Sequence, residues 1–140
     1  MAKTTDNLMK MINKHDKLDR YLAESKNKLI DCSLNEFLEK LLEKYNANKA
    51  DVLKRCGINQ IYGYQIFAGS KMPTRNKVIA LCFGFPLNIE DSQYLLQHAG
   101  ASILYPKVKR DSIILFGIDK RFTIFQVDDL LFEEKEKTIL

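Results

Sequence analysis

Two glutamines five residues apart, Gln60 and Gln65, have side chains well suited to reading the edge of a nucleic-acid base. An amide carries a hydrogen-bond donor beside an acceptor, and this pair matches the N6 and N7 groups of adenine. Ile61 and Tyr62 lie between the glutamines and can contact a thymine methyl group, and Asn59 comes just before them. These five residues are our candidates for base contacts, although both glutamines would be ordinary surface residues if no helix presented them.

The surrounding residues predict two short helices joined by a tight turn. Asn48 is a suitable N-cap for a helix that ends at Gly57, because glycine adopts the left-handed conformation without a steric penalty. Asn59 can cap a second helix over residues 60–68. In a helix-turn-helix, the second helix enters the DNA major groove, and residues near its N-terminus contact the bases.

Positive charge is concentrated in the same stretch. The formal net charge is +4, and residues 47–77 alone carry six Lys or Arg against one Asp. Such a segment is expected of an element that binds a polyanion, with a solvated basic surface as the alternative. These residues flank the second helix, where phosphates would run, and the helix N-termini at Asn48 and Thr74 can also meet phosphates. We expect phosphate contacts from Asn48, Lys49, Lys71, Arg75 and Lys77.

The rest of the chain also follows the helical period of 3.6 residues, so we expect an all-α protein. We divide it into an N-terminal amphipathic helical segment (1–32), a five-helix domain (33–100) and a helical C-terminal extension (101–140). Within the extension, Thr123 has the spacing of a capping box with the glutamine three residues later. The β-branched run at 112–116 is compatible with a strand, but the sequence offers no obvious partner strand.

The glycines and the proline of this region carry a resemblance to a known family. Gly57 lies in the turn, Gly69 ends the second helix, and Pro73 follows. With this spacing, residues 47–83 resemble the helix-turn-helix of the phage-repressor family (Cro/C1-type, xenobiotic-response-element) of bacterial regulators. Parts of residues 95–114 resemble a helical extension found behind this domain in many such regulators. The resemblance implies a lambda-repressor-like bundle in which Gln60, Ile61 and Gln65 face the bases, and Asn48, Lys49 and Lys71 lie near the DNA backbone.

Two residues of the second helix depart from the family pattern. Gly63 stands where the family usually has a buried aliphatic residue, and Phe67 where it often has glutamate. A glycine weakens a helix by about 1 kcal/mol relative to alanine. We expect Tyr62 or Phe67 to fill the space beside the glycine. Of the two tyrosines, we expect Tyr62 to face the groove and Tyr64 the core.

Other kinds of site find little support in the sequence. The three cysteines, Cys32, Cys56 and Cys82, are far apart and form no Cys-x-x-Cys pair, so we expect neither a disulfide framework nor a metal site. His15 and His98 have no carboxylate or cysteine at ligand spacing. No phosphate-binding glycine loop, nucleophile elbow or His-Glu-x-x-His motif is present, so we expect neither enzymatic activity nor a cofactor. The acidic residues near the C-terminus predict a solvated helix face: Asp128, Asp129, Glu133, Glu134 and Glu136.

These patterns favour a transcriptional regulator, a repressor or autoregulator, that binds specific sequences of double-stranded DNA. The sequence begins without a signal peptide and lacks the run of about 20 apolar residues that a membrane span needs, so we expect a cytoplasmic protein with no membrane partner. A homodimer reading two half-sites is plausible for such a regulator. The alternative is a protein-interaction module, such as an antitoxin-like protein. It would bind a toxin, kinase or polymerase component through the N-terminal segment or the C-terminal helices.

Overall fold

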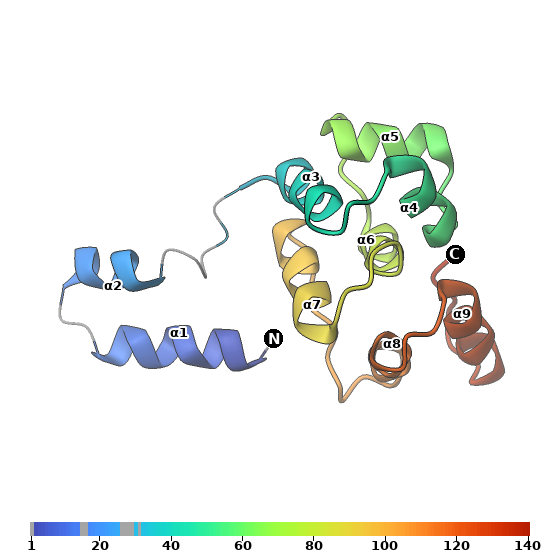
Figure 1. The fold of residues 1–140 in the computed structure, drawn as a ribbon. Coiled ribbons are helices and arrows are strands. Elements are labelled where there is room, and N and C mark those ends of the chain that lie inside the picture. The colour runs from blue at the N-terminus through green and yellow to red at the C-terminus, as the bar shows by residue number, and fades with distance from the viewer. Residues whose placement is uncertain (1, 15–16, 26–29, 31) are drawn as a thin grey trace. The chain divides into compact units, whose positions relative to one another are not determined.

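The computed structural model describes residues 2–14, 17–25, 30 and 32–140. These residues form nine helices and no strand, which confirms the predicted all-α class (Figure 1). The run at 112–116 lies inside a helix, so the strand alternative is wrong. The chain divides into two compact units, residues 1–31 and 32–140, and the predicted parts 33–100 and 101–140 therefore share one unit.

The N-terminal unit contains helices α1 (Ala2–Lys14) and α2 (Leu18–Ser25), as its amphipathic pattern predicts. Leu8, Met11 and Tyr21 are half-buried, whereas several other apolar side chains of the two helices stay exposed. No helix among the described residues is long and apolar enough to cross a membrane.

The second unit contains the remaining helices, which surround a central helix, α6. Every residue of α6 from Val78 to Cys82 is buried. Figure 1 shows α6 nearly end-on between α4, α7 and α8, and it packs against α4 and α7. The helices of this unit are α3 (Leu34–Lys44), α4 (Lys49–Cys56), α5 (Gln60–Ala68), α6 (Arg75–Cys82), α7 (Ile89–His98), α8 (Lys109–Asp119) and α9 (Ile124–Glu133).

Three of the helix junctions use the same turn. A residue with positive φ ends the helix, an apolar residue follows, and the next residue caps the new helix. The amide of the apolar residue donates to a carbonyl five residues back, which satisfies a free carbonyl at the helix end. Glycine occupies the left-handed position in only one of the three turns. Only that turn can therefore be recognised from a glycine in the sequence. The three turns are Asn46-Ala47-Asn48, Gly57-Ile58-Asn59 and Arg121-Phe122-Thr123.

A buried carboxylate joins the C-terminal extension to the helical bundle. Asp111, at the start of α8, is only 5% exposed. Its two oxygens accept hydrogen bonds from Arg75 Nη1 at 3.3 Å and Nη2 at 2.9 Å, and Oδ2 also accepts from the Tyr105 amide at 2.9 Å. Nearby, the buried Gln93 amide bonds both backbone groups of Leu104 at 2.7 Å. These contacts hold the connection between α7 and α8 against the bundle.

The expected solvated acidic face is wrong for Asp128. Its carboxylate accepts hydrogen bonds from the backbone amides of Ile139 at 2.6 Å and Leu140 at 3.0 Å. Arg110 holds the same segment by donating to the carbonyls of Lys137 and Thr138. Residues 137–140 therefore fold back onto α8 and α9. The capping box of α9 forms as predicted, with Thr123 and Gln126 bonded reciprocally.

Candidate nucleic-acid interface

Helices α4 and α5 are joined by the tight turn that the sequence predicts. Asn48 Oδ1 accepts from the Asp51 amide at 2.9 Å, and Gly57 ends α4 with φ +68°. Asn59 Oδ1 then accepts from the amides of Ile61 at 2.9 Å and Tyr62 at 3.2 Å. In Figure 1, α5 lies at the edge of the unit beyond α4. The turn therefore presents one side of α5 outward.

The outward side of α5 combines amide and apolar side chains. Gln60 is exposed, Gln65 is half-buried, and Ile61 is 74% exposed. Tyr64 lies one turn after Gln60, and its hydroxyl accepts from Gln60 Nε2 at 3.3 Å. Asn59 is also exposed, although its side-chain oxygen is already used in capping. The structure thus gathers Asn59, Gln60, Ile61 and Gln65, four of the five predicted base-contacting residues, on one accessible face.

The two tyrosines have the opposite orientation to the one we expected. Tyr62 is half-buried and packs against the core, with Lys77 Nζ lying 6.0 Å from its ring centroid. Tyr64 is 43% exposed on the outward face. The spacing of the residues predicts the observed orientation, because positions 60 and 64 lie on the same face of a helix, whereas position 62 lies on another face. Tyr64 therefore replaces Tyr62 among the outward-facing candidates.

Leu53 accounts for the glycine within α5. Gly63 is buried, and a Cβ atom at that position would overlap the methyl groups of Leu53 on α4. The expectation that Tyr62 or Phe67 fills this space is therefore wrong. Phe67 is buried elsewhere in the core, where the Lys49 Nζ lies 5.7 Å from its ring centroid. The close approach of α4 and α5 thus depends on a residue without a side chain.

The predicted phosphate-contacting lysines differ in how much of their charge is compensated. Lys71 is exposed just beyond α5, and within the described part of the chain its ammonium has no ion-pair partner. Lys49 Nζ lies 3.1 Å from a carboxylate oxygen of Glu39 on α3. Lys77 is half-buried and lies over the ring of Tyr62. Lys71 is therefore the lysine most available to an anion.

Arg75, which we expected to contact phosphate, is instead bonded within the molecule. Its guanidinium is held by Asp111 and also donates to the carbonyls of Ser102 at 2.9 Å and Ile103 at 3.1 Å. Its ability to bind a phosphate is correspondingly reduced. The Asn48 side chain is also occupied, since Nδ2 donates to Asp51 at 2.8 Å. The bond from Arg75 to Asp111 joins residues 36 apart in the chain, so the local pattern of charges does not predict it.

The thiols, imidazole and acids in the described ranges show no sign of a metal centre. No group of three His, Cys, Asp or Glu in those ranges is arranged to hold a metal ion. His98 stacks on the ring of Phe37, with centroids 4.0 Å apart, while His15 lies outside the described residues. Cys56 and Cys82 are buried in the core.

No known protein family, no curated protein and no solved structure matches this chain.

Proposed function

We propose that this protein is a cytoplasmic transcriptional regulator that binds specific sequences of double-stranded DNA through α5, as its phage-repressor-like motif implies. One observation carries this proposal: the outward face of α5 joins the exposed Gln60 amide to the exposed Ile61 and Tyr64, and the exposed Lys71 follows the end of the helix. Exposing large apolar side chains to water is unfavourable unless they have a partner, and base edges supply one.

The dimensions of the helix suit the major groove. The groove is about 12 Å wide, which is enough for an α-helix with its side chains. The first turn of α5 carries Gln60 and Ile61, at the end that recognition helices direct toward the bases. Lys71 follows the helix, where the next phosphates would lie. Lys49, Lys77 and Arg75 are weaker contributors, because each already interacts with another group of the protein.

Replacing Gln60 by alanine tests base recognition. Candidate sites are first selected from random DNA with the wild-type protein. We expect the Gln60→Ala variant to bind the best site about 1–3 kcal/mol more weakly and to lose preference at one base pair, because a paired amide contact is removed. Fluorescence anisotropy against the selected and a scrambled duplex measures both effects.

Two further variants serve as controls for this test. Gln97→Ala removes an amide from α7 and should leave binding unchanged. Tyr64→Phe removes the hydroxyl that accepts a hydrogen bond from the Gln60 side chain. This variant shows whether Gln60 recognises a base by its own contact or depends on Tyr64 to position it. If Gln60→Ala keeps the full preference of the wild type, the assignment of base contacts to this face is wrong.

Replacing Lys71 by glutamine tests the phosphate contact. Each neutralised phosphate contributes about 0.9 to the slope of log affinity against log salt, so the Lys71→Gln slope should be shallower by about one. The loss should be similar for specific and random duplexes, since phosphates carry no sequence information. Lys107→Gln removes another exposed lysine, from the C-terminal extension, and is the matched control. Equal slopes for both variants would contradict the proposed role of Lys71.

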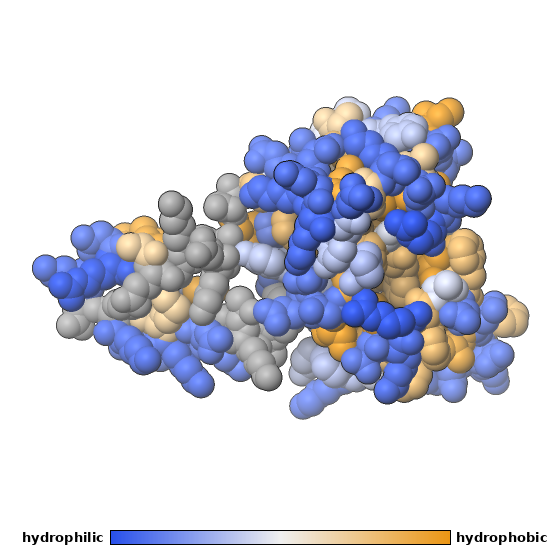
Figure 2. Space-filling view, in the orientation of Figure 1, coloured by the Kyte–Doolittle hydropathy of each residue, from blue (hydrophilic) through white to orange (hydrophobic). Residues whose placement is uncertain are grey.

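A protein partner is the second candidate, supported by exposed aromatic side chains on α8 and α9. Phe116 and Phe125 are each 52% exposed and Phe132 is 77% exposed. Figure 2 shows hydrophobic residues at the surface over these helices. A gel shift at low salt discriminates: no retardation of genomic fragments at micromolar protein favours a purely protein-binding role.

A further inference from the structure

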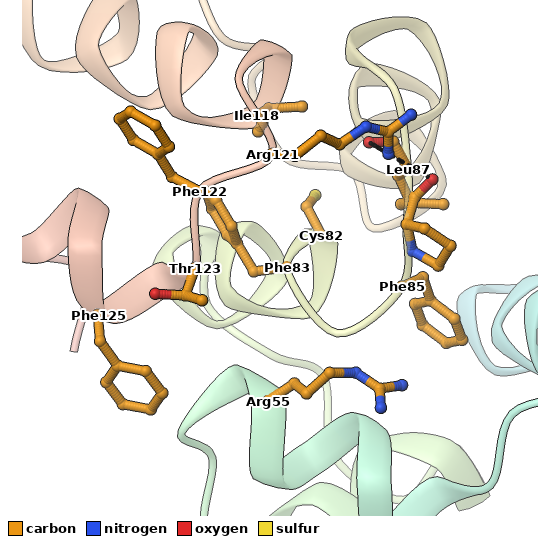
Figure 3. Close-up of a pocket in the computed structure, with 11 residues that line it drawn as sticks. Arg55, Cys82, Phe83, Phe85, Leu87, Ile118, Arg121, Phe122, Thr123 and Phe125 are labelled. Carbon is orange, nitrogen blue, oxygen red and sulfur yellow. Dashed lines mark hydrogen bonds between the residues drawn. The ribbon is translucent and has the colours of Figure 1, made fainter.

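The second unit contains a cavity of about 490 Å³, and no residue of α5 lines it. Its walls come from α4, from the end of α6 and the loop after it, and from the α8–α9 junction (Figure 3). This volume lies within the range of about 300–1,000 Å³ that is usual for small-molecule sites. The lining residues are Arg55, Cys82, Phe83, Phe85, Pro86, Leu87, Ile118, Arg121, Phe122, Thr123 and Phe125.

Apolar side chains form most of the wall, and two arginines supply its only charges. Four of the lining residues are phenylalanines, and no Asp or Glu is among them. In Figure 3, the guanidinium groups of Arg55 and Arg121 lie toward Phe85 and Leu87, whereas the ring of Phe125 lies at the other end. Aromatic rings therefore lie at both ends of the cavity, and the two arginines border one of these ends from opposite sides.

Backbone carbonyls hold each guanidinium in place without neutralising its charge. Arg55 Nε donates to the Gly84 carbonyl at 2.9 Å. Arg121 Nη1 donates to the carbonyls of Pro86 at 2.9 Å and Leu87 at 3.3 Å. Within the described part of the chain, the Nη atoms of Arg55 and the Nη2 of Arg121 have no hydrogen-bond partner. A guanidinium fixed along one edge keeps N–H donors in the planar arrangement that a carboxylate accepts.

The backbone of Arg121 indicates that its position is unusual for its residue type. Arg121 is the left-handed residue of the α8–α9 turn, with φ +62°, where glycine or asparagine is the common choice. The same position in the α4–α5 turn is held by Gly57. An arginine here costs some backbone strain, and it places a cation at the rim of an apolar cavity.

We propose that this cavity binds a small organic carboxylate with an apolar body, its acid group toward one of the two arginines, Arg55 or Arg121, and its body against the apolar wall. The Cys82 thiol is part of the apolar wall, since burial raises its pKa to about 12 and keeps it protonated at neutral pH. The site is independent of the proposed DNA-binding face. A ligand in it would contact α4 and the α8–α9 junction together.

Binding of 2-naphthoate to the full chain, without DNA, tests the proposal. Isothermal titration calorimetry gives the affinity, and amide chemical-shift changes locate the site. We expect saturable binding, with shifts at Phe83, Ile118 and Phe125. The neutral analogue 2-naphthalenemethanol should bind about tenfold more weakly, since charge-assisted hydrogen bonds are lost. Equal binding of acid and alcohol would overturn the carboxylate assignment, and an absence of binding or of shifts at these residues would overturn the site.

Variants at the two arginines complete the test. Either Arg55→Gln or Arg121→Asn should weaken naphthoate binding about tenfold and leave binding of the alcohol unchanged, which identifies the arginine that receives the acid; a loss with neither variant would overturn the proposal. Asparagine tolerates the left-handed turn, and Arg55→Gln gives the result independently if the turn variant unfolds. Lys54→Gln removes the neighbouring charge on α4, outside the cavity lining, and is the matched control. If Lys54→Gln weakens binding as much as the effective arginine variant, general electrostatic attraction explains the result and the proposal fails.

Discussion

Asp111→Ala is expected to destabilise the unit of residues 32–140 by about 3 kcal/mol, toward the lower end of the loss seen when one partner of a buried ion pair is removed. Asp111 is 5% exposed, and its carboxylate holds both the Arg75 guanidinium and the Tyr105 amide. Its removal leaves Arg75 Nη1 and the Tyr105 amide without an acceptor, while Arg75 Nη2 keeps its bond to the Ile103 carbonyl. The Arg75 side chain is 30% exposed and can regain some water, which is why the larger losses of the range are not expected.

Urea unfolding followed by circular dichroism measures this effect as a lower midpoint with an unchanged slope. Asp129→Ala removes an exposed carboxylate from α9 and should change stability by less than about 0.5 kcal/mol. The double variant Arg75→Met with Asp111→Leu should recover much of the loss, because a buried pair can often be replaced by apolar side chains. An Asp111→Ala protein as stable as the Asp129→Ala control would show that the pair contributes little.

Gly63→Ala is expected to lower stability by about 1–2 kcal/mol, although alanine is the better helix former by about 1 kcal/mol. The added methyl group would overlap the side chain of Leu53, which is itself only 1% exposed and cannot move into solvent. Overfilling a packed core costs about 1–3 kcal/mol, and this cost exceeds the gain in helix propensity.

A second variant shows whether Leu53 is the cause. Leu53→Ala alone should cost about 2–5 kcal/mol through the cavity it leaves. In the double variant with Gly63→Ala, the new methyl group enters that cavity. The double variant should therefore lose less stability than the sum of the losses of the two single variants. Ala68→Gly on the exposed side of α5 reports helix propensity alone and should be mildly destabilising. Strictly additive losses at positions 53 and 63 would rule out the proposed overlap.

The helix boundaries were accessible from sequence because local chemistry sets them. Asn48, Asn59, Thr74, Asn88 and Thr123 each cap the helix that follows, through a side-chain oxygen that accepts from a backbone amide two or three residues on. Such a bond depends on neighbours that are always close in the chain. The outward position of Gln60 and Ile61 follows from the same local pattern together with the period of the helix.

The differences between prediction and structure lie where distant residues meet. Arg75 looks like a free cation until Asp111, 36 residues later, is placed beside it. Asp128 looks solvated until residues 139 and 140 return to it. The overlap of Gly63 with Leu53 and the cavity between α4 and the α8–α9 junction likewise depend on packing between helices. No periodicity or cap predicts such contacts, because they depend on the relative placement of whole helices.

The burial of two of the three cysteines offers a practical route to spectroscopy. Burial raises the pKa of both the Cys56 and Cys82 thiols to about 12, so almost no reactive thiolate exists at neutral pH. Cys32 is half-buried and stands at the first position of the second unit. A maleimide dye or nitroxide label would therefore attach selectively at Cys32 in the native protein. Without any substitution, the chain thus carries a single attachment point from which distances to DNA or to a second copy can be measured.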